Sequence, residues 1–402
     1  MTAARSVTDL IDAVRVAQLT RDLIRFDTTN PPGAEGECAR FVGALLQDLG
    51  CAVRYVEPEP GRVSVIARYG TGASGLPVLL VNGHLDVVPA IAAEWAWPPF
   101  DGTIRDGLVL GRGSADMKGG VAAAIEALRV CRSAGVALGC ELLFHFVADE
   151  ETGAAAGTAA LLAAGELVAA AALVPEPSGL GVSVAERGAL LADIEVRGRP
   201  AHGSQPQFGV SAIEKAAVVV RALHRAQFAP RNHPLLGEPT CNVGTIVGGS
   251  ARNIVASSAV LGIDRRSVPG EKAPELISEI EAAVRAASPG EELDLEVRQV
   301  VFVEASELSS GHPFVELALS VLEGPDGPPT VVGSTFGTDA RFMRELGIPT
   351  IVYGPGSVRQ AHTADESVAI DALVTAARSM ARLFLAFGEH YRSHAGSWAV
   401  GD

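Results

Sequence analysis

Three consecutive acidic residues end an apolar segment of the sequence, and their position suggests chemistry. The segment "ELLFHFVADEETG" runs from Glu141 to Gly153 and delivers Asp149, Glu150 and Glu151 directly after strand-forming residues. Like charges side by side repel one another, and a strand end packed into a domain has little water to screen them. We therefore expect a cation opposite these acids.

Other acids and two histidines follow strand-like segments in the same way. Ligands of open parallel sheets bind at the carboxyl ends of the strands, so these side chains are expected to converge on one edge. Imidazole and carboxylate groups without a thiolate are the ligand set of zinc, cobalt or manganese in a hydrolytic site. The set comprises His84, Asp86, Asp116, Asp149, Glu150, Glu151, Glu176, His362, Asp365 and Glu366.

The pair His84 and Asp86 has the spacing His-x-Asp. A metal-bound imidazole usually donates its other N–H to a carboxylate, which fixes its tautomer, so Asp86 is predicted to orient His84. An isolated His-x-Asp pair is more often structural. The plain alternative for the acids is that each caps a helix or pairs with an arginine, which is ordinary for one acid but improbable for the whole set.

The segments that carry these residues alternate between strands and helices. Apolar residues at helical spacing predict a first helix over residues 8–26 and a second over 38–49. Continuous apolar runs such as "LPVLLVNG" and "CELLFHFVA" are typical of strands buried on both faces. The sequence therefore predicts an α/β domain with a mostly parallel sheet flanked by helices. His145, inside one of these runs, is predicted to be a hydrogen-bonded core histidine.

The pattern changes after about residue 178. A strand, a long helix over 210–227, two antiparallel strands, a helix over 273–287 and a last strand follow in the order β-α-β-β-α-β. This order is the ferredoxin-like pattern. We expect a catalytic domain of residues 1–179 and 299–402, interrupted by an inserted α+β domain of residues 180–298.

Composition limits the classes of partner. Of the 402 residues 48% are apolar, and the formal charge is −15. Nucleic acids and anionic membranes require clustered Lys and Arg, so neither is expected as a partner. Five cysteines without Cys-x-x-Cys spacing, and an N-terminus without an apolar core, favour reduced thiols and a cytoplasmic protein.

Five motifs in a fixed order resemble those of one enzyme family. "GHLDVVP", "GRGSADMKGG", "EETG", "PEPSG" and "AHTADE" resemble the co-catalytic zinc metallohydrolases, among them acetylornithine deacetylase, succinyl-diaminopimelate desuccinylase, aminoacylase and a glutamate-releasing carboxypeptidase. The resemblance runs from "DTTNPPG" at residue 27 to the last helix. It implies two divalent ions, zinc in the first place, with cobalt or manganese as alternatives.

The resemblance also implies roles for the residues at the strand ends. Asp116 would bridge the two ions, and Glu150 would be the general base. Asp86 would be a carboxylate that contacts a metal ligand and not the ions themselves. Asp149 is left without a role and is expected to cap a helix or bond within its loop. His84 and Glu176 would complete one metal site, and Glu151 and His362 the other.

Further residues are implied in and beside the inserted domain, which would act as a lid and form a homodimer. His202 in "GRPAHGSQP" would reach the neighbouring subunit's site and polarise the scissile carbonyl. Arg266 would hold the substrate's carboxylate, and Asn253 would also contact substrate. Gly337 and Asp339 in "STFGTDARF" would line the loop that faces the substrate.

The expected reaction is hydrolysis of an amide bond that removes an acetyl or succinyl group from an N-acyl amino acid. The segments "DTTNPPG", "AERGAL" and "GRPAHGS" resemble those typical of the deacetylase and desuccinylase branch of the family. A dipeptidase or carboxypeptidase on the same scaffold is the alternative, because the metal motifs do not separate the two. A non-catalytic relative that binds metal or peptide is a third reading, against which the presence of Glu150 speaks.

Overall fold

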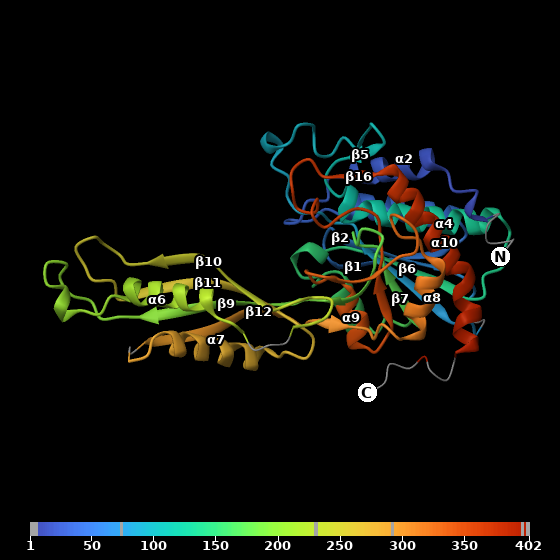
Figure 1. Cartoon of the computed structure of the whole chain (residues 1–402). Helices are drawn as coiled ribbons and strands as arrows, with labels where there is room; N and C mark the ends of the chain where they lie inside the picture. Colours follow the sequence, from blue (N-terminus) through green and yellow to red (C-terminus); the bar gives the residue numbers. More distant parts are fainter. Residues whose placement is uncertain (1–6, 73–74, 229–231, 291–292, 395–397, 399–402) are drawn as a thin grey trace. The chain divides into compact units, whose positions relative to one another are not determined.

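The chain folds into two compact units in the computed structural model, which describes residues 7–72, 75–228, 232–290, 293–394 and 398 (Figure 1). The first unit comprises Met1–Val184, Leu308–Val332 and Thr338–Asp402, and the second comprises Ala185–Glu307 and Gly333–Gly337. The second unit is thus inserted into the first. The boundary expected at residue 298 falls inside a strand that extends to Val303.

The main sheet is parallel at its centre and antiparallel at its edges. Strand β3 is parallel to β6 and β7, and β15 is parallel to β7, whereas β1, β2 and β8 pair antiparallel with their neighbours. Its order is β1 (Ala52–Glu59), β2 (Arg62–Tyr69), β6 (Glu141–Val147), β3 (Val78–His84), β7 (Ala171–Val174), β15 (Thr350–Val352), β8 (Val182–Glu186) and β13 (Ser306–Glu307), with β14 (Val331–Ser334) also pairing β8.

A small antiparallel sheet of the first unit joins segments that are far apart in the sequence. Its strands are β4 (Thr103–Arg105), β5 (Leu108–Leu110) and β16 (Ser367–Ala369), with β5 in the middle. The pairing of β16 with β5 brings the chain after His362 next to the loop that carries Asp116.

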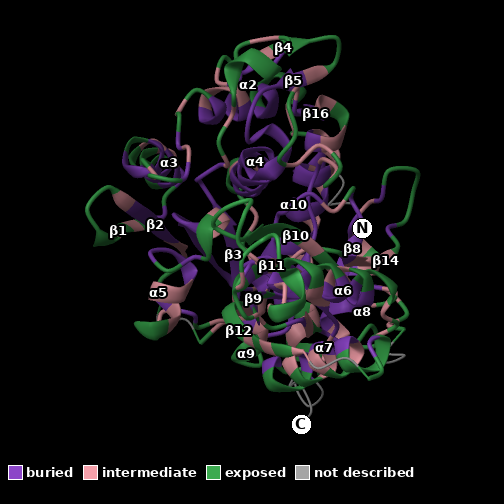
Figure 2. Ribbon diagram, turned by 90° about the vertical axis from the view of Figure 1, so that its left-hand side faces the viewer, coloured by how far each residue is buried: buried purple, intermediate pink, exposed green. Residues whose placement is uncertain are grey.

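Helices cover both faces of the main sheet, as expected for strands of continuous apolar residues (Figure 2). In β6, Phe144 points to α10 and meets Phe384 edge-on, whereas Leu143 belongs to the core under α5 and α9. The helices of this unit are α2 (Ala13–Ile24), α3 (Gly36–Asp48), α4 (Gly119–Ser133), α5 (Thr158–Ala163), α8 (Pro313–Val321), α9 (Ala340–Glu345) and α10 (Ile370–Ser393).

One local expectation for this unit is wrong, and another is correct only in part. The helix predicted over residues 8–26 is shorter because α2 begins only after Asp12, whose carboxylate accepts the N–H groups of Val14 and Arg15 as an N-cap. His145 is fully buried, but neither of its ring nitrogens has a hydrogen-bond partner among the described residues.

A glycine sets the distance between α4 and the sheet. A Cβ atom on Gly120 would collide with the carbonyl oxygen of Pro175, so the first turn of α4 can approach the end of β7 only without a side chain there. This close approach lies directly beside Glu176. The packing of α4 therefore helps to place two of the predicted site residues, Asp116 and Glu176, on the same edge.

The second unit is a four-stranded antiparallel sheet with two helices on one face. Leu190, Leu261, Val219 and Ile280 contribute to the core between sheet and helices. The elements are β9 (Gly188–Arg197), α6 (Ala212–Arg225), β10 (Thr240–Gly248), β11 (Ser258–Ser267), α7 (Ala273–Ala287) and β12 (Asp294–Val303), and the strand order is β10-β11-β9-β12. The predicted ferredoxin-like arrangement is confirmed.

In the part of the chain that the structure describes, no helix is both long and apolar enough to cross a bilayer. Four of the five cysteines are buried, Cys241 is half-buried, and all five are unpaired. Burial raises the pKa of each thiol, to about 11 for Cys38 and Cys241 and to about 12 for the other three.

Candidate metal centre

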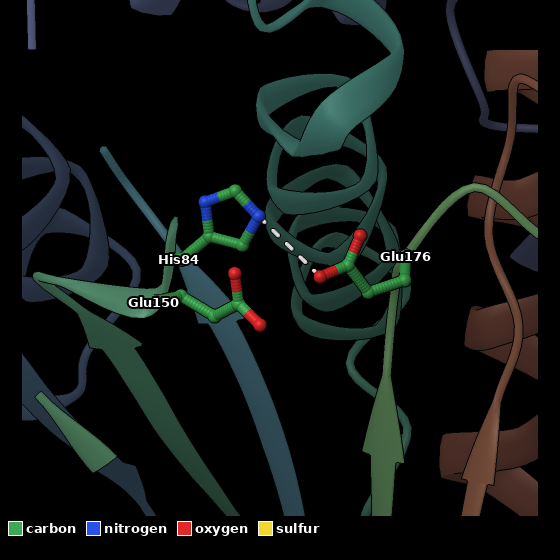
Figure 3. A group of neighbouring side chains, drawn as sticks. All are labelled: His84, Glu150 and Glu176. Carbon is green, nitrogen blue, oxygen red and sulfur yellow. Dashed lines mark ion pairs between the residues drawn. The ribbon is translucent and has the colours of Figure 1, made fainter. Parts of the chain in front are cut away.

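His84 is the last residue of β3, and its imidazole lies among carboxylates from neighbouring segments (Figure 3). Its Nε2 atom is 3.0 Å from Oδ1 of Asp116 and 3.4 Å from Oε1 of Glu176. Glu150, from the turn after β6, points towards the same space. The ends of parallel strands β3, β6 and β7 thus bring together side chains that the sequence separates widely.

A second imidazole faces the same aspartate from the other side. Nε2 of His362 lies 3.5 Å from Oδ2 of Asp116 and 3.0 Å from Oε2 of Glu151. The side chain of His362 is half exposed, whereas those of Asp116 and Glu151 are almost fully buried. Asp116 therefore offers one oxygen to each of two imidazoles.

Two overlapping groups of donor atoms have the spacing of a metal site. Ligand atoms of His84, Glu150 and Glu176 lie within 4.8 Å of one another, and so do those of His84, Asp116 and Glu151. Figure 3 shows the first of these groups. Geometry places Glu150 as close to the cluster as the expected ligands, so distance alone does not distinguish a ligand from a base at this position.

The electrostatics of the cluster call for a cation. Burial, followed by the charge of Asp116, raises the pKa of Glu176 to about 8. Burial also raises the pKa of Glu150 well above its usual value, and the neighbouring acids add to this. Burial alone would lower the pKa of His84, but the carboxylates, Glu176 foremost, raise the pKa well above its ordinary value.

Two oxygens of the cluster have no hydrogen-bond partner among the described residues. Oε1 of Glu151 and Oε2 of Glu176 are buried, and no described residue donates a hydrogen bond to either. Buried carboxylate oxygens without donors are costly unless they bind a metal. The donors, imidazole nitrogen and carboxylate oxygen, are those of zinc in hydrolytic sites and suit cobalt and manganese as well. The residues therefore fit divalent metal ions.

The carboxylate of Asp86 does not orient His84 in the predicted way. Nδ1 of His84 lies 2.9 Å from the main-chain carbonyl oxygen of Asp86 but 3.7 Å from its carboxylate. The carboxylate instead accepts the backbone N–H groups of Glu150 and Glu151, each at 3.1 Å. Since the backbone carbonyl already fixes the ring of His84, the carboxylate serves to hold the turn that carries both glutamates.

A buried glutamate, whose role the sequence did not indicate, holds the loop of Asp116. The carboxylate of Glu366 accepts the N–H groups of Gly113, Ala115 and Asp116 at 2.8–3.0 Å and pairs with Arg112 at 2.6 Å. Glu366 follows His362 closely in the sequence. The same segment therefore supplies the site residue His362 and anchors the loop that carries Asp116. Glu366 stood among the acids after predicted strands, but its partners lie far away in the sequence.

The residues predicted in the inserted domain are placed only within their own unit. His202 is exposed, with Nδ1 at 2.7 Å from Oγ of Ser204, and its loop pairs with that of Asn253 through Gly203 N–H. Arg266, near the other end of β11, forms an ion pair with Asp264 on the same strand. Their roles stay predictions, as does that of Gly337.

Asp339 belongs to the first unit, whereas Gly337 belongs to the second. Asp339 is buried at the start of α9 in the first unit and accepts a hydrogen bond from Thr158 at 2.5 Å. Burial raises the pKa of its carboxyl group. Within the predicted loop Gly337 is half-buried and Asp339 is buried.

The sequence of this chain is similar to those of known proteins. Residues 80–386 match the model of peptidase family M20/M25/M40. The chain is 32% identical to acetylornithine deacetylase of Myxococcus xanthus, over 94% of this chain and 98% of that protein. It is 30% identical to N-formyl-4-amino-5-aminomethyl-2-methylpyrimidine deformylase of Bacillus subtilis, over 89% and 91% of the two chains.

A solved structure shows the same fold. The Bacillus subtilis YXEP protein, described as a dinuclear metal binding peptidase from the M20 family, superposes with a TM-score of 0.71 at 15% identity, over 94% of this chain and 99% of that one. The match of the family model to most of the chain, together with relatives at 30% identity or more over nearly their full length, shows that this protein is a hydrolase of peptidase family M20/M25/M40.

Proposed function

We propose that this chain removes a short acyl group, acetyl or succinyl, from an N-acyl amino acid in a reaction that depends on two divalent metal ions. The observation that carries the proposal is the position of Asp116, whose two carboxylate oxygens face His84 and His362 separately. A carboxylate placed in this way is suited to bridging two ions. The deacetylase relative supports the substrate class.

The side chains divide into two ligand sets around the shared aspartate. His84 and Glu176 would hold one ion, Glu151 and His362 would hold the other, and Asp116 would serve both. Zinc is our first assignment, with cobalt and manganese as alternatives for the same donors. When bound, such ions supply Lewis acidity that polarises the amide carbonyl and makes water a better nucleophile.

Glu150 moves the proton. Its carboxylate accepts a proton from the attacking water and passes it to the departing amine, so that one water and one amide give a carboxylic acid and an amine. Asp86 holds the backbone of Glu150 through the hydrogen bond to its N–H, which keeps the base in place. Desolvation of Glu150 raises the pKa of its carboxyl group well above its usual value, which favours uptake of a proton from water near neutral pH.

Substrate recognition falls to the inserted unit. Arg266 exchanges its present partner, Asp264, for the α-carboxylate of the substrate, and its half-buried guanidinium has the fork geometry for a bidentate pair. Asn253 and Gly337 contact the substrate, and His202 from a second subunit stabilises the oxyanion. The protein accordingly works as a homodimer formed through the inserted unit.

A substrate panel tests the proposal. The purified protein is loaded with Zn²⁺ or Co²⁺, and amine release is measured from N-acetyl and N-succinyl amino acids, dipeptides and the formylated aminopyrimidine of the deformylase relative. The proposal predicts the highest kcat/KM for an N-acyl amino acid. A preference for dipeptides would establish the peptidase alternative. A preference for the pyrimidine would show that the substrate is a formylated aminopyrimidine and not an N-acyl amino acid. No release from any compound would favour a binding protein.

A further inference from the structure

The segment that precedes α3 is hydrogen-bonded to the residues that follow β3, the strand that ends at His84. Asn30 donates its backbone N–H to the carbonyl of Val87 at 2.8 Å, and Val87 donates in return to Thr28 at 3.1 Å. The hydroxyl of Thr28 donates to the carbonyl of Leu85 at 2.6 Å. Asn30 is therefore fixed close to the metal centre, where it is buried.

The side-chain amide of Asn30 meets three oxygens. Its Nδ2 atom lies 2.8 Å from Oδ2 of Asp86, 3.1 Å from Oδ1 of Asp149 and 3.0 Å from Oγ1 of Thr152. An amide nitrogen carries two hydrogens, so the three acceptors share them. One NH₂ group thus bonds to both buried carboxylates and connects Asp86 with Asp149.

Both carboxylates hold the turn that carries the glutamates of the metal centre. Asp86 accepts from the backbone of Glu150 and Glu151, at the start of the turn. Asp149 accepts from the N–H of Ala156 at 2.9 Å and from the hydroxyl of Thr152 at 2.5 Å, at its end. Asp149 itself adopts a left-handed backbone with φ 67°, a conformation that needs such support in a residue with a side chain.

The charges around this point are unbalanced in favour of acids. Arg62 pairs with Asp149 at 3.0 Å and with Glu35 at 2.8 Å, and the charge of Asp86 also acts on Arg62. Burial raises the pKa of Glu35, and the charge of Asp86 adds to this. Arg62 and the buried Lys118, whose charge also acts on Asp86, face three acids, and the neutral amide between Asp86 and Asp149 adds a donor without adding charge.

We propose that Asn30 is a positioning residue, whose amide ties Asp86 to Asp149 and so aims Glu150 and Glu151 at the metal centre. The inference rests on the proposed function for its kinetic consequence but not for its metal-binding consequence. It also gives Asp149 a role: the carboxylate anchors the far end of the same turn. Neither residue touches the substrate or the ions.

The test compares Asn30→Ala, Asp149→Ala and the double variant with the wild type, and uses Asp27→Asn as control. Asp27 lies in the same segment, is exposed and bonds only to Thr29 among its described contacts. Co²⁺ titration followed by the visible absorption spectrum reports ligand geometry without any substrate. Thermal unfolding of the metal-free proteins reports general damage.

The proposal predicts Co²⁺ binding about 10- to 100-fold weaker in Asn30→Ala, with an altered spectrum, the range found for residues that support metal ligands. The double variant is expected to bind Co²⁺ about as weakly as either single variant, because both act on one turn. The kcat should fall while KM changes less than about twofold, as expected when ligand geometry rather than binding is disturbed.

A wild-type Co²⁺ spectrum and affinity in Asn30→Ala, with only a lower unfolding temperature, would show that Asn30 is merely structural and would overturn the proposal. Absence of Co²⁺ binding in the wild type would overturn it together with the metal centre. If the wild type hydrolyses no amide but Asn30→Ala changes the Co²⁺ spectrum, the proposed function fails and the positioning role stands. Asn30→Asp, which puts a third carboxylate between two others, should be worse than Asn30→Ala in every readout.

Discussion

Oδ1 of Asp116 lies 3.0 Å from Nε2 of His84, and the other oxygen of the same carboxylate lies 3.5 Å from Nε2 of His362. One aspartate thereby joins a histidine at the end of β3 to a histidine in the loop after β15. With Glu176 beside the first imidazole and Glu151 beside the second, each half of the cluster has its own carboxylate. This division predicts how the metal content responds to single substitutions.

Loss of the shared aspartate should cost more metal than loss of the outer histidine. We expect Asp116→Asn to lose both ions, because each half then keeps one carboxylate and one imidazole, whereas His362→Ala should keep one ion per chain at His84, Glu176 and Asp116. The measurement is metal content per chain after gel filtration, with Asp101→Asn, an exposed acid, as control. Equal metal content in Asp116→Asn and wild type would contradict the shared role.

Glu150→Gln separates the base from the ligands. The amide of glutamine keeps the size of the side chain but cannot accept the proton of water, so kcat should fall by about 10²- to 10⁴-fold. The metal content should stay at the wild-type value. Exposed Glu94→Gln is the matched control. A variant that loses an ion along with its activity would make Glu150 a ligand instead.

Substitution of Arg266 should act on substrate binding. Loss of a hydrogen-bonded charge pair is worth about 1.5–3 kcal/mol, so Arg266→Ala should raise KM for N-acyl amino acids roughly 10- to 100-fold. Arg266→Lys should restore only part of the substrate binding that Arg266→Ala loses, because lysine cannot form the bidentate pair that the guanidinium forms with a carboxylate. Arg298→Ala, which removes an exposed arginine on the same sheet, should leave KM unchanged. The role of Arg266 would be refuted by a KM that does not move in Arg266→Ala.

The buried His145 should make the fold sensitive to acid. Burial, with a smaller effect of Arg54 and Arg68, lowers the pKa of His145 to about 3 from 6.5. The neutral ring is required in the folded state, so its stabilising contribution is complete above pH 6.5 and declines as the pH falls towards 3. By linkage the loss reaches about 2 kcal/mol at pH 5.

His145→Leu removes this group and provides the comparison. Urea unfolding at pH 8 and pH 5 should show that the variant loses about 2 kcal/mol less free energy of unfolding over this interval than the wild type. Leucine suits the site because Leu143 and Ile66 lie on the same face. Parallel stability curves for the two proteins would mean that His145 is protonated, or hydrogen-bonded, in the folded state.

Much of the fold follows from patterns that the sequence displays directly. The continuous apolar residues of β3 and β6 predicted a sheet buried on both faces, and the alternation in β9 and β11 predicted the antiparallel inserted domain. The start of α2 was missed because the cap at Asp12 overrides the apolar spacing before it. Boundaries of this kind depend on single hydrogen bonds.

The support around the metal centre was harder to predict than its ligands. Ligands come from residue types with distinctive chemistry at strand ends, but Asn30 and Glu366 act through partners distant in the sequence, which only the folded chain brings near. Asp86 was correctly predicted to contact His84, but its backbone carbonyl oxygen makes the contact with the imidazole ring, not its carboxylate. Because every residue has a backbone carbonyl, a contact of this kind cannot be predicted from the residue types.

The most direct test of the two-ion centre is the anomalous diffraction of a crystal of the zinc-loaded protein, recorded at the zinc absorption edge. We expect two peaks per chain, both at about 2.0–2.2 Å from oxygens of Asp116, one next to His84 and Glu176 and the other next to His362 and Glu151. A single peak that Asp116 does not contact, or peaks away from both histidines, would contradict the two-ion centre.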